Sequence, residues 1–337
     1  MSERIYMLIV LILLISLFPI ASNAQDNQKL AQTGFQYLSV PTSARASSIG
    51  EATTTVPMGS VSLFFNPAGM AHVNKFIDVS FGQTDWIADI SYNSFSISVA
   101  PSKSKYGVFG FSLVSVDYGG LEGTMVWANT QGYIETGEFS PSAQAFGVGY
   151  AITLTDKFSV GGQAKLAYQS LGKNVIPATD STNIVIKNRA NATAYDFGTI
   201  YNTGFKSLAF GMSIRNFSDE IKFESEGFQL PLTFRMGISM NVLDFSSRED
   251  NSHSLMVSFD AVHPRSYPEY VNLGFEYSLL NLVSLRSGYI FNRDEQGLTI
   301  GGGIQKDLGG SFIAVDYSSV PFGLLGNVQI ISFQFSI

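Results

Sequence analysis

The chain has 337 residues, no cysteine, three histidines and a formal net charge of −7. Without cysteine it forms no disulfide, thiolate metal site or acylated lipoprotein anchor, and its acidic balance argues against a nucleic-acid partner. Charged residues make up only 14%, whereas glycine (32), phenylalanine (27) and tyrosine (15) are abundant. This composition is typical of a lipid-facing β-barrel rather than a soluble enzyme.

The first 24 residues have the pattern of a secretion signal peptide. An apolar run covers residues 6–20, and the small-residue stretch 21–24 follows it. The run is shorter than the ~20 residues that a membrane-spanning helix needs. We therefore predict cleavage after Ala24, with a retained membrane anchor as the alternative, and a polar leader over residues 25–33.

Residues 34–74 contain two helix starts. Asn66 is a good N-cap and Pro67 suits the first helical position. Thr42 or Ser43 could cap a second short helix that runs to Ile49. Neither helix is long enough to be stable alone. Both need a surface to pack on, and the lumen of a barrel formed by the rest of the chain supplies one.

From residue 75 onward, large apolar side chains alternate with small or ionised ones, which is the period of a strand with one apolar and one polar face. Each candidate segment has roughly the ~9–11 residues that a tilted membrane strand requires. There are about fourteen, and an even strand number is typical of single-chain bacterial barrels. They cover residues 75–84, 87–100, 105–118, 141–154, 157–170, 190–203, 205–217, 230–243, 253–263, 269–279, 282–292, 296–306, 311–319 and 326–337.

The predicted fold class is therefore all-β, a transmembrane antiparallel β-barrel of about 14 strands with a short N-terminal helical or irregular segment folded into the lumen. The predicted domains are a signal peptide (1–24), a periplasmic leader and lumenal plug (25–74) and an outer-membrane β-barrel (75–337). The predicted location is the bacterial outer membrane, with its lipid as a partner.

The connections between strands differ in length on the two sides. Barrels of this type have short periplasmic turns and longer external loops. If the N-terminus is periplasmic, the periplasmic side has the brief connections 101–104, 155–156, 202–204 and 307–310. The connection 245–251 on the same side is longer and weakens the pattern. We expect external loops of about twenty residues at 119–140 and 171–189, and a third near 218–229.

The facing of each strand follows from its alternation. In residues 232–240 the even positions are all large and apolar, so they should meet lipid while Arg235 points inward. An ionised side chain facing acyl chains would cost a few kcal/mol. The same reasoning directs seven more charges inward: Lys165, Asp196, Arg215, Asp260, Glu276, Arg286 and Asp316. Four cations and four anions predict a paired, packed interior rather than an ion-selective pore.

The sequence predicts no enzyme, cofactor or metal site. Only His72, His253 and His263 could act as a base. A Ser/His/Asp set around His263 is conceivable, but a surface histidine is the favoured interpretation. The glycines at 301–303 lack the lysine of a phosphate loop. They lie inside a strand pattern, where they would allow the plug to approach closely or the barrel to curve.

An ordered set of motifs resembles the PorV/PorQ family of outer-membrane proteins, which are relatives of the FadL-type transporters of hydrophobic compounds. The set covers essentially the whole mature chain. It comprises residues 41–52 around Ala44-Arg45-Ala46, then Asn66-Pro67-Ala68-Gly69, then residues 276–277, 285–289, 315–317 and 325–326, and the terminal strand with Phe333 and Phe335. One departure is the final Ile337, where many barrels end in an aromatic residue.

The resemblance implies a 14-stranded barrel with its N-terminal segment folded inside. For the best-known member it also implies service in type IX secretion, in which the barrel accepts secreted cargo that bears a C-terminal sorting domain. The first predicted function is thus to bind or shuttle protein cargo or secretion components through the external loops. The alternative is FadL-like transport of a small hydrophobic ligand. The candidate lumenal residues are the eight inward charges together with Arg45, Asn66, Pro67 and Gly69.

Overall fold

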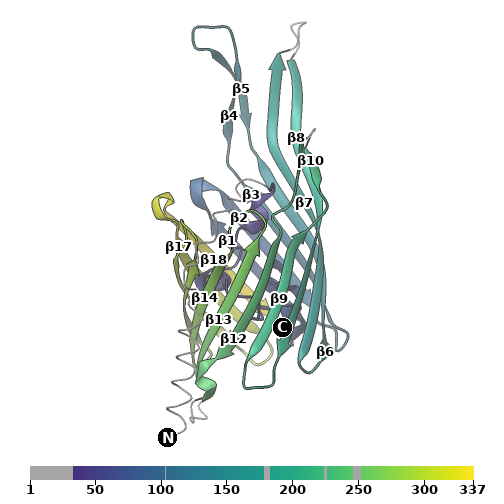
Figure 1. The fold of residues 1–337 in the computed structure, drawn as a ribbon, viewed down its shortest axis with the longest axis vertical. Coiled ribbons are helices and arrows are strands. Elements are labelled where there is room, and N and C mark those ends of the chain that lie inside the picture. The colour runs from purple at the N-terminus through teal and green to yellow at the C-terminus, as the bar shows by residue number, and fades with distance from the viewer. Residues whose placement is uncertain (1–32, 103, 178–182, 224–225, 246–251) are drawn as a thin grey trace.

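A computed structural model describes residues 33–102, 104–177, 183–223, 226–245 and 252–337. Fourteen strands form a closed antiparallel barrel around a short N-terminal segment (Figure 1). The predicted signal peptide and most of the predicted leader lie outside the described residues. Within the described ranges, no helix is both long enough and apolar enough to cross a membrane.

Each barrel strand pairs with its neighbour along the chain, and β1 closes the barrel against β18, with Phe81 opposite Phe333. All fourteen predicted strands are present, so the predicted fold class is confirmed. The strands are β1 (Ile77–Asp85), β2 (Ser91–Val99), β3 (Val108–Asp117), β6 (Ser142–Thr155), β7 (Phe158–Pro177), β8 (Asn183–Asn202), β9 (Ala209–Phe217), β12 (Thr233–Asn241), β13 (His253–Pro264), β14 (Tyr270–Leu279), β15 (Val283–Phe291), β16 (Leu298–Asp307), β17 (Phe312–Pro321) and β18 (Asn327–Ser336).

Two β-ribbons project beyond the barrel at the end opposite the short turns (Figure 1). One is the hairpin of β4 (Leu121–Val126) and β5 (Tyr133–Phe139), and the other is the continuation of β7 and β8. The predicted external loops at 119–140 and 171–189 thus contain regular β-ribbons, which the sequence analysis did not predict. The sequence there contains β-branched residues, a residue type that favours strands, and the backbone register places Val175 opposite Val185.

The remaining connections contain smaller elements. The predicted loop near 218–229 contains a small ribbon of β10 (Ile221–Phe223) and β11 (Glu226–Phe228). Single 3₁₀ turns occur at η4 (Ile87–Asp89), η5 (Val242–Phe245) and η6 (Gly323–Leu325). Most of the predicted inside turn at 245–251 lies outside the described residues.

The exterior of the barrel is apolar, and the alternation of each strand explains why. On β12, Met236 is 50% exposed while the adjacent Arg235 is only 4% exposed. On β6, Phe146, Val148 and Tyr150 are all exposed outward, whereas Ala145 is buried. The predicted facing of β12 is therefore confirmed, and the exterior suits contact with acyl chains.

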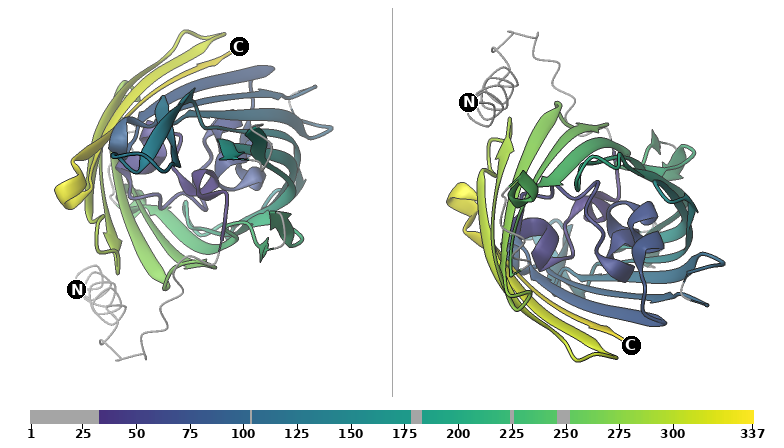
Figure 2. Two further views of the ribbon diagram at one scale, coloured as in Figure 1. Left: turned by 90° about the horizontal axis from the view of Figure 1, so that it is seen from above. Right: turned by 90° about the horizontal axis from the view of Figure 1, so that it is seen from below.

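The N-terminal segment fills the lumen, as the views along the barrel show (Figure 2). It consists of η1 (Gln36–Ser39), α2 (Ala44–Ser48), η2 (Gly59–Phe64) and η3 (Pro67–His72). The Ser43 side chain caps α2 by accepting from Ala46 N, and the Asn66 side chain caps η3 by accepting from Ala68 N at 3.1 Å. Both predicted helix starts are thus present. We call residues 34–74 the plug.

Candidate functional site

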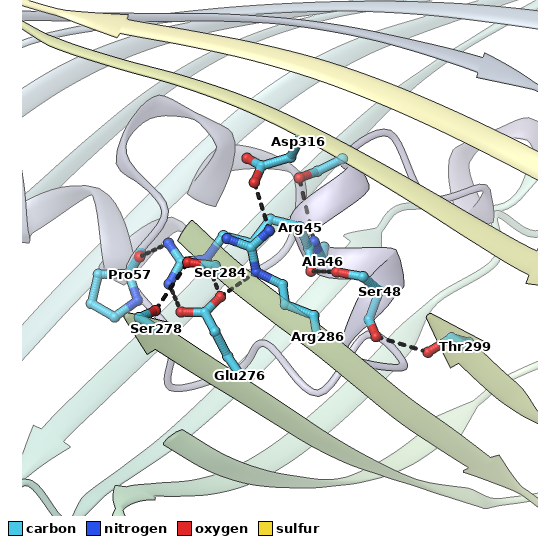
Figure 3. A network of polar contacts seen from close by, with 11 residues as sticks. Arg45, Ala46, Ser48, Pro57, Glu276, Ser278, Ser284, Arg286, Thr299 and Asp316 are labelled. Carbon is cyan, nitrogen blue, oxygen red and sulfur yellow. Dashed lines mark hydrogen bonds and ion pairs between the residues drawn. The ribbon is translucent and has the colours of Figure 1, made fainter. Parts of the chain in front are cut away.

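One side of the plug is fixed to the wall by a chain of ion pairs (Figure 3). Arg45 of α2 donates from Nε and Nη2 to the two carboxylate oxygens of Glu276 on β14, each at 2.8 Å. Arg286 on β15 donates to Glu276 at 2.5 Å and to Asp316 on β17 at 2.6 Å. Because Glu276 and Arg286 lie opposite each other in the ladder, the strand pairing itself brings them together.

A second set of contacts holds the stretch that follows α2. Arg235 on β12 donates to the Glu51 carboxylate at 2.7 Å and to the Glu51 backbone oxygen at 2.9 Å. Asp260 on β13 accepts from the backbone N–H groups of Thr53 and Thr54, each at 3.0 Å, and from the Thr54 hydroxyl at 2.7 Å. All three donors reach Oδ2, where they stabilise the charge of this buried carboxylate.

The opposite wall carries the third group of predicted charges. Lys165 on β7 lies 2.8 Å from Asp196 on β8 and donates to Asn216 at 2.6 Å. Arg215 donates to Leu38 O of the plug at 3.2 Å. A bulge in β9 forms this arrangement, because Asn216 has a left-handed φ of 58° and its N–H reaches Asp196 at 2.7 Å.

The lumenal charges are therefore paired with one another, with the plug, or with backbone groups. All eight predicted wall charges face the lumen, and Arg45 joins their network from the plug. This geometry fixes the plug in place. Their importance for function stays a prediction, and so does that of the plug residues Asn66, Pro67 and Gly69.

The Asn66-Pro67 turn lies against two glycines of the wall. Asn66 Nδ2 donates to Thr54 O at 2.6 Å and to Thr199 O at 3.2 Å. Gly161 and Gly198 lie opposite each other on β7 and β8. A Cβ on Gly198 would lie 1.8 Å from Asn66 Oδ1, and one on Gly161 would lie 2.5 Å from the Pro67 carbonyl carbon.

Two further glycines make close contacts with plug residues. Within the plug, a Cβ on Gly69 would lie 2.7 Å from Ser62 Oγ. On β16, a Cβ on Gly301 would lie 2.5 Å from Ser48 Cβ of α2. The close approach of the plug that the glycines at 301–303 predict is therefore confirmed at Gly301.

Replacing Gly198 with valine should displace the plug. The valine side chain would occupy the position of the Asn66 amide, so the plug must shift or the turn must open. We expect higher conductance in planar bilayers than for the parent protein. Gly162→Val is the control, because a Cβ there meets only ordinary contacts at 3.5 Å or more. Equal conductance of both variants and the parent would contradict the tight seat of the Asn66 turn.

Two site residues escaped the sequence reasoning. Glu51 pairs with Arg235 although it lies in the plug, where no strand parity applies. Asp78 of β1 is 3% exposed and accepts from Ser60 N at 2.6 Å, from Gln334 at 2.7 Å and from Ser336 at 2.6 Å. Its inward position follows from the alternation of β1, so the parity argument could have found it.

A narrow, mostly apolar cavity lies between the plug and the wall of β3 and β6. The space not occupied by atoms is about 510 Å³, including the part open to solvent. Tyr37 borders it and donates from its hydroxyl to Gln144 O at 2.7 Å. Burial raises the pKa of Tyr37, so the phenol stays neutral. The apolar lining comes mainly from Leu38, Val40, Leu63, Phe64, Phe65, Val114 and Ala145, with Lys165, Arg215 and Glu51 at its edge.

The histidines form no catalytic set within the described residues. His263 is exposed and its Nδ1 lies 2.8 Å from Glu269. Asp260 faces the lumen, so the conceivable set around His263 is wrong, because the two side chains leave β13 on opposite faces. His72 Nε2 lies 3.5 Å from the Ser159 hydroxyl, and His253 Nδ1 lies 2.7 Å from the Tyr277 hydroxyl. The described ranges also hold no group of three or more candidate metal ligands.

No protein-family model and no curated protein sequence matches the chain. Among solved structures, the Ralstonia pickettii toluene transporter TbuX is similar at 11% identity and a TM-score of 0.57, over 87% of this chain and 98% of that one. The Pseudomonas putida toluene transporter TodX is similar at 12% and 0.55, over 86% and 96%. A Pseudomonas aeruginosa FadL homologue is similar at 12% and 0.52, over 88% and 98%.

These similarities extend over nearly the whole of each structure, but identities this low establish the fold alone. They agree with the predicted outer-membrane location. The finer resemblance to PorV/PorQ proteins and the type IX secretion role find no support among them. The chain has the fold of FadL-type bacterial outer-membrane barrels.

Proposed function

We propose that the protein carries a small hydrophobic compound across the bacterial outer membrane through its plugged lumen. The observation that carries this proposal is the apolar cavity between the plug and the wall. Apolar space that side chains leave unfilled lowers stability, so its position beside the plug favours a role in holding a compound. The similarity in fold to two toluene transporters and a FadL homologue supports the same class of cargo.

The chemistry at the edge of the cavity favours an uncharged compound. Lys165 is neutralised by Asp196, and Glu51 by Arg235. Arg215 donates to a backbone oxygen and lies over the Phe65 ring, 5.8 Å from its centroid. Lys165 and Glu51 are already paired and offer little to an ionic ligand, whereas the aromatic and aliphatic lining gains from contact with an apolar one.

Filling the cavity should stop transport without unfolding the barrel. Ala145 is buried and lines the cavity, so Ala145→Phe would place a ring in the space that the compound needs. We expect uptake of radiolabelled toluene, used as the probe, to fall at least about tenfold in cells that depend on this protein.

The matched control is Val148→Phe on the same strand. Val148 is 67% exposed on the outer face, so its replacement adds apolar surface to the lipid side only. Uptake should stay at the level of the parent protein. Unchanged uptake in Ala145→Phe, with the folded barrel present in the membrane, would refute the cavity as the route.

A second candidate function rests on the two projecting ribbons (Figure 1). The tip of the β4–β5 hairpin exposes Val126, Trp127 and Tyr133, which a bare transporter does not require. Exposed aromatics on a rigid ribbon suit contact with a secreted protein, as in type IX secretion. If the hairpin binds secreted proteins, deletion of residues 121–139 should abolish the capture of cargo proteins. If the protein transports a hydrophobic compound, toluene uptake should survive this deletion.

A further inference from the structure

Three cations share the outer face of the β7–β8 ribbon: Lys173, Lys187 and Arg189. Lys173 lies directly opposite Lys187 in the ladder, and Arg189 is two residues from Lys187, so strand alternation puts all three on one face. All three are exposed. This is the face that, further down β8, meets lipid through Tyr195 and Phe197, which are 45% and 53% exposed. We call the three residues the cationic patch.

A bulge in β7 creates the patch. Below it, the odd positions of β7 face inward, as the buried Lys165 and Ala167 show. Ser170 lies opposite Arg189 and Gly172 opposite Asn188, so Leu171 is the extra residue. The insertion reverses the parity of the strand and turns Lys173 outward. Without it, Lys173 would face the inside of the ribbon.

The patch lies where lipid headgroups begin. Tyr168 and Asn191 lie opposite each other, and Tyr168 is the last outward aromatic residue on this part of β7. Arg189 lies two residues beyond that pair, which is roughly 7 Å along the strand, and Lys187 lies roughly 13 Å beyond it. Aromatic residues mark the membrane–water interface of such barrels, so the patch meets the headgroup layer.

Within the described residues, the patch has no acidic partner. No ion pair joins Lys173, Lys187 or Arg189 to a carboxylate, and the lysines repel each other across the ladder. The β4–β5 hairpin, which carries Glu122, Glu135 and Glu138, packs on the other face, because Phe139 lies against Gly172. The outer face therefore stays open to an anion from the membrane.

We propose that the cationic patch binds the phosphate groups of lipid A in the outer leaflet of the outer membrane. The proposal follows from charge complementarity and from continuity with the lipid-facing surface. Phosphates between Lys173 and Lys187 relieve their repulsion, and Arg189 adds a planar donor nearer the acyl chains. It rests on the outer-membrane location and is independent of which compound crosses the lumen.

The test compares two triple variants of the full-length protein. Lys173→Gln/Lys187→Gln/Arg189→Gln removes the patch, and Lys105→Gln/Lys157→Gln/Lys206→Gln removes three exposed cations from the turns at the opposite end. Both sets lie outside the lipid-facing belt, and the heat-dependent gel shift checks that each variant is folded. The probe is synthetic diphosphoryl lipid A, titrated into detergent-solubilised protein and followed by native mass spectrometry.

We expect the patch variant to bind lipid A at least about tenfold more weakly than the parent protein. The control variant should bind like the parent, and dephosphorylated lipid A should bind weakly and equally to all three proteins. Unchanged binding by the patch variant would overturn the proposal. An equal loss in the control variant, or full retention of dephosphorylated lipid A by the parent, would overturn it as well. Toluene uptake by the patch variant reports separately on the proposed transport function.

Discussion

Replacing Arg286 with alanine should destabilise the folded barrel by about 3–5 kcal/mol. Arg286 is the only cation that contacts Asp316 among the described residues, and it also shares Glu276 with Arg45. Its side chain is 2% exposed, so its loss leaves a buried carboxylate without a counter-charge. Urea titration of the barrel in lipid vesicles, followed by gel mobility of the folded form, measures the change.

Two comparisons make this prediction specific. Lys75→Ala removes a partly exposed pair with Asp307 at 3.7 Å, which should cost no more than about 1 kcal/mol. Arg286→Met combined with Asp316→Leu removes both charges while Glu276 keeps Arg45, so the loss should be much smaller than for Arg286→Ala. A double variant as unstable as the single one would show that the ion pair itself is not the cause.

Placing lysine at Met236 should cost about 2–4 kcal/mol, because the side chain would enter the acyl-chain region. Met236 lies near the middle of β12 and is 50% exposed on the outer face. The neighbouring Arg235 faces the plug, so Arg235→Lys should instead loosen the contact with Glu51. Refolding yield and urea titration in vesicles of defined lipid separate the two effects.

The matched control is Val242→Lys. Val242 is 43% exposed but follows the end of β12 in η5, where a lysine can reach water. Its cost should be at most about 1 kcal/mol. Equal costs at positions 236 and 242 would mean that the outer face of β12 does not lie in lipid.

The barrel itself could be predicted because alternation acts over a few residues. Each strand shows its own alternation of apolar and polar residues, as β12 does around Arg235. Lipid requires apolar side chains on the outer face, and the packed lumen accepts polar ones on the inner face. The extent of β7 and β8 could not be predicted in this way. Beyond the acyl-chain region no lipid imposes an apolar face, so the sequence of the ribbon that holds Lys173 and Lys187 lacks the alternation that predicts a strand.

The sequence predicted most of the charged residues that line the lumen, but it did not predict which of them form ion pairs. Parity alone placed Glu276, Arg286 and Asp316 inward, and the ladder then brought the first two together. The contacts of Arg45 and Glu51 depend on where the plug rests, which no local pattern encodes. The bulge at Asn216 also changes which positions of β9 face the lumen, so a count of odd and even positions does not predict that Asn216 points inward.

Affinity purification from the native outer membrane, with lipid-soluble compounds and protein partners both analysed, tests the central proposal most directly. We expect a small hydrophobic compound to remain with the parent protein and with Val148→Phe, and to be absent from Ala145→Phe, since only that variant fills the cavity. Recovery of secreted proteins bearing a common sorting domain, without any hydrophobic compound, would contradict transport and favour the secretion function.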